Sequence, residues 1–167
     1  LTALFGFMQF LAAPIIGELS DMYGRKKLLT IGVATLAVSQ LFFATGIAVH
    51  SLFILFSARA IAGIAGANFS VAQAMIADVT PPENRARNFG LIGAAFGIGF
   101  ILGPLLGGTV AAASGDPALP FIFAGILGIV NVILVTFFLR ETHHVRKEKA
   151  RITPLRAISN IKNAFND

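Results

Sequence analysis

The sequence predicts an all-α, multi-pass membrane protein with five transmembrane helices. Of its 167 residues, 56% are hydrophobic and 13% charged, and the mean hydropathy is +0.80, whereas a soluble domain is about 45–50% apolar and about 25% charged. The few charges are clustered and leave five long apolar runs between them. A helix needs about 20 apolar residues to cross a hydrocarbon core of about 30 Å. The composition argues against a soluble enzyme and against a nucleic-acid partner, despite the net charge of +5.

The distribution of basic residues predicts a topology. Twelve of the 13 Lys and Arg residues fall on alternate connections between the runs, and such connections lie in the cytoplasm. Leu1 is thus expected outside and the tail in the cytoplasm, with the bundle in the plasma (inner) membrane. An odd number of spans that starts outside predicts one further span before Leu1, and so a longer protein. The expected spans form a bundle over residues 1–140 and cover residues 1–19, 28–49, 52–77, 83–113 and 118–139.

The connection after the first span combines small and charged residues at fixed spacing. Residues 17–27 read GELSDMYGRKK. Gly17 lets helix backbones approach closely, Asp21 can accept hydrogen bonds from free amides or from an arginine, and Gly24 permits a tight reversal of the chain. Any helix hairpin with cytoplasmic positive charge could contain such a turn, so the residues alone leave both interpretations open.

Arg59 is the one charge inside an expected span. It lies about seven residues into the third span, which is roughly 10 Å deep at 1.5 Å per residue, and an arginine near the centre of a span costs about 2.5–3.5 kcal/mol on insertion scales. Its side chain either extends to the outer interface or faces an internal cavity. Helical spacing favours a cavity, because one small and polar face is formed by Arg59, Gly63, Gly66, Ser70 and Gln73.

The fourth span is rich in glycine. Residues 80–83, TPPE, suit a helix start, and Gly99, Gly103 and Gly107 repeat every four residues, a spacing that lets two membrane helices pack closely. Pro104 removes a backbone donor and is expected to bend the helix. The stripe serves either plain packing or a seal along one side of a transport path.

Residues 114–117, SGDP, predict the turn before the fifth span. Beyond it, residues 141–167 are expected to form a cytoplasmic linker, in which residues 152–165 make either a short amphipathic helix on anionic lipid or a disordered segment. His143 and His144 are adjacent, without nearby thiols, and predict no metal site. Polar residues within the spans serve either helix–helix hydrogen bonds or a substrate. The candidate substrate path comprises Gln9, Gln40, Ser70, Gln73 and Asn131.

Three motifs in the right order resemble those of the major facilitator superfamily. Residues 17–27 resemble the signature between its second and third helices, and residues 59–67, RAIAGIAGA, resemble the fourth-helix signature. Residues 99–108, GFILGPLLGG, resemble the fifth-helix motif of drug:proton antiporters. The resemblance covers residues 1–142 as helices two to six of twelve. Short matches at residues 77–78, 88–91 and 140–142 point to the tetracycline-resistance-type branch.

The resemblance implies roles for particular residues. The cytoplasmic latch motif, which helps to hold the outward-facing state, would comprise Gly17, Asp21, Gly24, Arg25 and Asp78. Arg59 would assist proton coupling. The antiporter hinge and seal would comprise Gly99, Gly103, Pro104, Gly107 and Gly108. Tetracycline exporters usually have a carboxylate midway along the third helix, where this chain has Ser39 beside Gln40, and this difference speaks against tetracycline itself.

The sequence therefore predicts a secondary transporter that is not an enzyme. It would export a small amphipathic compound, a drug or a tetracycline-like molecule, while protons enter, by alternating access of two six-helix halves. The proton is the coupling ion and no cofactor is expected. The partners are the substrate, the bilayer, the missing first helix and the C-terminal half of the same protein. Uptake of a sugar or metabolite by the same fold, and a non-transporting scaffold or receptor, are the alternatives.

Overall fold

The fold is an all-α bundle of antiparallel helices, as the computed structural model describes it for residues 1–142. Five stretches of these residues are long and apolar enough to cross a membrane, with α3 and α4 together forming one and η1 and α5 another. The predicted fold class and number of spans are thus confirmed. The elements in order are α1 (Thr2–Tyr23), α2 (Arg25–Ala48), α3 (Leu52–Gly66), α4 (Asn68–Val79), the 3-10 turn η1 (Pro82–Asn84), α5 (Arg85–Ser114) and α6 (Leu119–Phe138).

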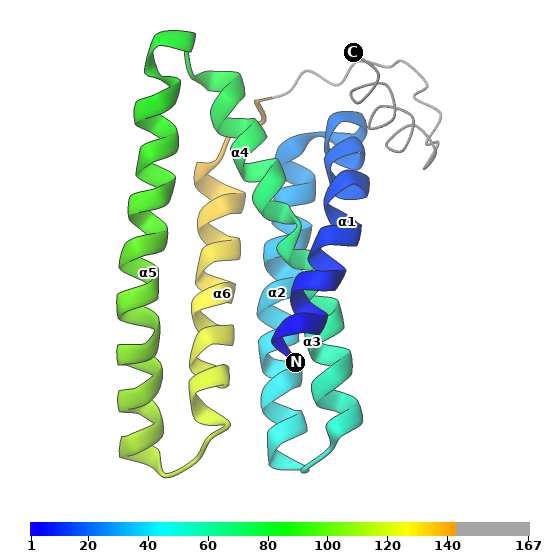
Figure 1. Ribbon diagram of the computed structural model, residues 1–167, viewed down its shortest axis with the longest axis vertical. Helices are drawn as coiled ribbons and strands as arrows, with labels where there is room; N and C mark the ends of the chain where they lie inside the picture. Colours follow the sequence, from blue (N-terminus) through cyan, green and yellow to red (C-terminus); the bar gives the residue numbers. More distant parts are fainter. Residues whose placement is uncertain (143–167) are drawn as a thin grey trace.

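Helix α2 is the centre of the bundle. It packs most extensively against α6 on one side and α3 on the other, and α1 packs against α3. Figure 1 shows α5 at the edge, next to α6. Because the helices alternate in direction, α1, α4 and α6 end where α2 and α5 begin. This shared end, called the basic end below, has the basic residues of two connections: Arg25, Lys26, Lys27, Arg85 and Arg87.

The helices extend beyond the apolar runs at the basic end. Helix α1 continues to Tyr23 and α2 begins at Arg25, so Gly24 alone separates them, with φ at 97°. Charged residues can continue a helix here because water and lipid head groups solvate their side chains at the membrane surface. The single span expected over residues 52–77 is instead two helices, interrupted at Ala67.

Close helix contacts occur at glycines outside the α5 stripe. A Cβ atom at Gly63 would lie 2.5 Å from the Phe5 carbonyl oxygen, and one at Gly125 would lie 2.5 Å from the Leu41 side chain. The absent side chains thus let α1 cross α3 and α6 approach α2. By contrast, no atom of the described residues lies within 4 Å of a Cβ built at Gly17 or at any of the stripe glycines Gly99, Gly103, Gly107 and Gly108.

Within the described residues, Gly17 and the α5 stripe have no helix packed closely against them, since α5 packs on α6 and the end of α4 with its glycines facing open space. Close packing at Gly17 and along the stripe therefore stays a prediction for the whole protein. Helix α5 also runs as one helix through Pro104, and Figure 1 shows α5 as a single helix without a break.

The predicted turn after α5 is present, but Thr80 does not cap a helix as predicted, because Pro82–Asn84 form the 3-10 turn η1 and α5 begins at Arg85 without a side-chain cap. The buried Thr80 side chain accepts a hydrogen bond from Asn88 Nδ2 at 2.9 Å, which joins the end of α4 to the first turn of α5. At the other end Gly115 adopts φ of 67°, and Asp116 Oδ1 accepts from the Ala118 N–H at 2.8 Å, starting α6. The predicted amphipathic helix, along with His143 and His144, lies outside the described residues.

Candidate functional site

Arg25 is the centre of an ion-pair cluster at the basic end. The reversal at Gly24 places it one helical turn after Asp21, and its Nη2 atom lies 3.2 Å from Asp21 Oδ1. Its Nη1 atom lies 3.1 Å from Asp78 Oδ2 at the end of α4. The Arg25 side chain is 12% exposed, Asp78 26% and Asp21 59%. The structure thus brings together the charged residues of the expected latch, from three helices.

Glu141 joins α6 to the same cluster. Its two carboxylate oxygens accept the backbone N–H groups of Arg25 at 3.0 Å and Lys26 at 3.1 Å, the first two residues of α2. Lys26 Nζ in turn donates to the Thr136 carbonyl oxygen at 2.8 Å, in the last turns of α6. The Thr142 hydroxyl donates to Asp78 Oδ2 at 3.2 Å. Negative charge at the start of α2 and positive charge at the end of α6 both suit the helix dipoles.

Glu141 is not among the site residues predicted from the sequence. The signal was present, because Glu141 is the first acidic residue after the last apolar run and stands within one of the short matches to the tetracycline-resistance-type branch. Its partner, however, is backbone that lies more than 110 residues earlier in the chain. Only the packing of α2 against α6 brings the two together. The cluster of Asp21, Arg25, Asp78, Glu141 and Thr142 is called the Arg25 cluster below.

We expect Glu141→Gln to lower the stability of the bundle by about 1 kcal/mol. The amide keeps one acceptor oxygen but loses the negative charge at the N-terminus of α2, and such charges contribute about 0.3–1 kcal/mol, or up to about 2 kcal/mol in partly buried positions. The measurement is the midpoint of thermal unfolding in detergent, at low and at high salt. Glu83→Gln is the matched control, since Glu83 is an exposed acid with no ion pair among the described residues. Equal midpoints for the two variants would contradict this role.

Arg59 lies inside the bundle against two aromatic rings. Its guanidinium carbon is 4.3 Å from the centre of the Phe43 ring on α2 and 5.9 Å from that of Phe121 on α6. The two rings are themselves 4.6 Å apart. An arginine over an aromatic face gains cation–π stabilisation that is largest where water is excluded. Within residues 1–142 no carboxylate lies at ion-pair distance from Arg59.

The small, polar face expected beside Arg59 does not line a water path in the described residues. Gly63 is buried where α1 crosses, and the Gly66 carbonyl oxygen accepts a hydrogen bond from Gln9 Nε2 at 3.2 Å. The Ser70 hydroxyl donates to the Ala67 carbonyl oxygen within its own chain turn. This face therefore packs on α1, whereas the long Arg59 side chain reaches α2 and α6.

The other residues of the candidate substrate path do not gather at one site. Gln40 is half-buried on α2, Gln73 half-buried on α4, and Asn131 exposed on α6, and none of them forms a hydrogen bond with residues 1–142. Ser39 is 2% exposed and donates to the Leu36 carbonyl oxygen at 2.7 Å. The position where a carboxylate would be expected thus contains a neutral, satisfied hydroxyl.

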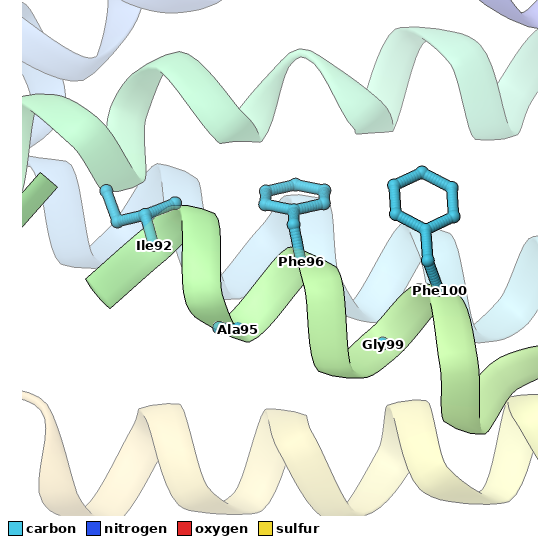
Figure 2. A pocket seen from close by; sticks show the side chains of 5 residues that line it. All are labelled: Ile92, Ala95, Phe96, Gly99 and Phe100. Carbon is cyan, nitrogen blue, oxygen red and sulfur yellow. The ribbon is translucent and has the colours of Figure 1, made fainter. Parts of the chain in front are cut away.

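An apolar hollow of about 480 Å³ lies along α5, and its lining includes only Gly99 from the expected site residues. Figure 2 shows the Phe96 and Phe100 rings projecting from α5 on the same side. Phe96 meets Phe69 of α4 edge to face, with ring centres 5.1 Å apart. The lining is Ile92, Ala95, Phe96, Gly99 and Phe100. Such a surface suits the apolar part of a ligand and has no charge to select one.

Comparisons with known proteins agree with this architecture. The tetracycline resistance protein, class C, of Escherichia coli is 42% identical over 159 residues, which is 95% of this chain and 38% of that protein. The quinolone resistance protein NorA of Staphylococcus aureus (strain MRSA252) is 37% identical over 142 residues, 84% of this chain and 35% of that protein. This chain thus spans little more than a third of these relatives.

The crystal structure of the human organic anion transporter MFSD10 (TETRAN) superposes with a TM-score of 0.80 at 30% identity, over 94% of this chain and 35% of that one. The family model described as Major Facilitator Superfamily matches residues 1–166. Because that match covers nearly the whole chain, this multi-pass membrane protein belongs to the major facilitator superfamily, with tetracycline- and quinolone-resistance proteins among its relatives.

Proposed function

We propose that this chain forms helices two to six of a twelve-helix transporter that exports a small amphipathic compound in exchange for protons. The Arg25 cluster is the observation that carries the proposal. It ties the ends of α1, α2, α4 and α6 together through ion pairs and hydrogen bonds at the surface of the bundle. Ion pairs at a partly exposed site are weak enough to open and close during a cycle.

Alternating access requires contacts that exist in one orientation and not in the other. The Arg25 cluster is suited to this task, because α1, α2, α4 and α6 can separate at the basic end only if Arg25 loses Asp78 and Glu141 leaves the start of α2. In the proposed cycle the cluster is closed in the outward-facing state. It is open while the substrate enters from the cytoplasm, and it closes before the substrate is released on the outer side.

Arg59 is proposed to couple this change to protons. A cation in the bilayer that lacks a carboxylate partner among residues 1–142 can influence the pKa of an acid elsewhere in the protein. That acid would come from the missing first helix or from the C-terminal half. Protonation of the acid would release its attraction for Arg59, and the Phe43 and Phe121 rings provide the place where the guanidinium then rests.

The proposed substrate is a small amphipathic compound, a drug or a tetracycline-like molecule. Ser39 offers no negative charge on α2, where the resemblance to tetracycline exporters implies a carboxylate, and this difference speaks against tetracycline itself. The names of the relatives include quinolone as well as tetracycline resistance, which supports a drug-like substrate. The protein is proposed to reside in the plasma (inner) membrane with its tail in the cytoplasm, and to need no cofactor besides the proton.

The proposal is tested by substrate-dependent proton flux in everted membrane vesicles containing the full-length protein. When the vesicle interior is made more acidic than the medium, the vesicles should accumulate a fluorescent amphipathic dye. Adding the dye should in turn dissipate the proton gradient. Vesicles without the protein are the control. Proton movement in the same direction as the substrate would show uptake of a metabolite instead. Absence of flux for a panel of amphipathic compounds and sugars would favour a scaffold or receptor and refute transport.

A further inference from the structure

The junction between α3 and α4 divides a membrane span near its middle. Helix α3 ends at Gly66 and α4 begins at Asn68, within a span that runs from Leu52 to Val79. Figure 1 shows α4 leaving this junction at a tilt, toward the start of α5. Interrupted helices in transporters are tolerated where neighbouring groups satisfy the freed backbone. At this junction, side chains of the neighbouring helices bind the backbone.

Two amide side chains hold the junction, each from a different side. Gln9 of α1 donates to the Gly66 carbonyl oxygen at 3.2 Å, at the end of α3. Asn68 Nδ2 donates to the Leu29 carbonyl oxygen of α2 at 3.1 Å, at the start of α4. Asn68 is 4% exposed. The junction is thus attached to α1 through Gln9 and to α2 through Asn68.

Gly32 provides the space for the Asn68 side chain. A Cβ atom built at Gly32 would overlap the Asn68 amide, with no other neighbour as close. The glycine is therefore explained by the asparagine: the amide sits directly on the backbone of α2, one helical turn after the carbonyl that it binds. This arrangement is a specific fit between two residues that are 36 positions apart in sequence.

The Asn68 amide is only half satisfied. Its Oδ1 atom is buried and has no hydrogen-bond donor among the described residues. Buried polar atoms are nearly always paired, and an unpaired one calls for an explanation. An acceptor without a donor makes this arrangement less favourable than one in which the amide is fully paired. It therefore lowers the cost of a change in the angle of α4 at this point, while the donor side of the amide stays bound to Leu29.

Helix α4 is attached to α2 at both of its ends. Asn68 binds Leu29 at the start of α4, and Asp78 binds Arg25 at its last turn. These two points are ten residues apart on α4, about 15 Å along the helix. When the surface ion pair opens, the buried amide bond is the attachment to α2 that is left among the described hydrogen bonds and ion pairs.

We propose that Asn68 is a positioning residue of the transport cycle: its side chain, seated on Gly32, is the pivot on which α4 turns when the Arg25–Asp78 pair opens. The inference rests on the proposed function, because the Arg25 cluster is taken to open once per cycle. It adds that the buried end of α4 stays in place while its end at Asp78 moves.

A pair of substitutions that moves side-chain volume from residue 68 to residue 32 distinguishes this role from simple packing. Asn68→Ala leaves a hole over Gly32 and removes the donor to Leu29. Adding Gly32→Ala places a methyl group where the amide was, so the double variant regains the packing but not the hydrogen bond. Gly32→Ala alone clashes with Asn68 and is expected to be unstable. Asn68→Ser, whose hydroxyl is too short to reach Leu29, is a second variant that creates no clash.

Two measurements on the full-length protein test this role. One is the distance between two spin labels, and the other is the effect of each variant on KM compared with its effect on the maximal transport rate. The chain contains no cysteine, so spin labels are introduced at Tyr23→Cys and Val79→Cys, which are exposed at the basic end on α1 and α4. For N68A/G32A we expect a thermal midpoint close to the parental one, for Asn68→Ser a slightly lower one, and for both an unchanged KM for a fluorescent amphipathic dye. The maximal rate should fall roughly tenfold, as for the loss of one hydrogen bond, and the label distance distribution should broaden.

A double variant that transports at the parental rate, with the parental distance distribution, would overturn the pivot and leave Asn68 a packing residue. A broadened distribution in a protein that moves no dye with protons would support the pivot and refute the proposed function. The two inferences can therefore fail separately.

Discussion

Replacing Arg59 with alanine is expected to abolish proton-coupled efflux while membrane insertion stays intact. Insertion should improve, because an arginine near the centre of a span costs about 2.5–3.5 kcal/mol. Coupled efflux should nevertheless fall to the background of vesicles without the protein, because no other cation of the described residues lies as deep within a span to act on the proton-binding acid. The measurement is dye accumulation driven by a proton gradient in everted vesicles with the full-length protein.

The controls separate the charge of Arg59 from its packing. Arg59→Lys retains the cation and should preserve part of the coupled efflux. Phe43→Leu removes the ring that lies 4.3 Å from the guanidinium carbon but leaves the charge, so it should change the rate by a few-fold only. Normal proton-coupled efflux in Arg59→Ala would contradict the role of Arg59 in proton coupling. Loss of the protein from the membrane would instead show that Arg59 supports the fold.

Replacing Arg25 with alanine should open the basic end of the bundle. The variant leaves Asp78 without its ion pair, at 26% exposure, and Asp21 without its partner on α2. Partly exposed ion pairs contribute up to about 1 kcal/mol each, so the loss of two should shift the balance between closed and open states by about tenfold. Coupled efflux should fall by a similar factor, since the outward-facing state is no longer held.

Labelling of a buried position measures this opening. Ser20 is 1% exposed in the last turns of α1, and Ser20→Cys changes the side chain by one atom in a chain without cysteine. In the Arg25→Ala background, a water-soluble maleimide should modify this cysteine about tenfold faster, in proportion to the open population. Lys27→Ala is the matched control, because Lys27 is an exposed cation two residues away with no ion pair among the described residues. Equal labelling rates in the two backgrounds would contradict the latch.

The sequence was sufficient for the fold class and for the charged residues of the latch. Apolar runs of about 20 residues have few alternatives to a membrane helix, and a glycine between two charged helix ends predicts a reversal. Asp21 and Arg25 are one turn apart, so their ion pair is a local property. The family resemblance added Asp78, and the structure places it 3.1 Å from Arg25.

The positions of the close helix contacts were not predictable in the same way. The α5 stripe has the more regular glycine spacing, yet the tight contacts are at Gly32, Gly63 and Gly125. The spacing of the glycines shows that one face of a helix has only small residues. It does not show which helix lies against that face. The same holds for the polar face beside Arg59, whose glycines Gly63 and Gly66 lie against α1.

The sequence by itself determined that the protein spans a membrane, how its helices alternate, and where charge is concentrated, because these follow from the hydrophobic cost of each residue in the bilayer. Only the tertiary structure decided that Glu141 binds the start of α2, that Arg59 rests between Phe43 and Phe121, and that Asn68 is seated on Gly32. Each of these contacts joins residues far apart in the chain. Which helices become neighbours is decided by the packing of the whole bundle, and no local pattern in the sequence contains that information.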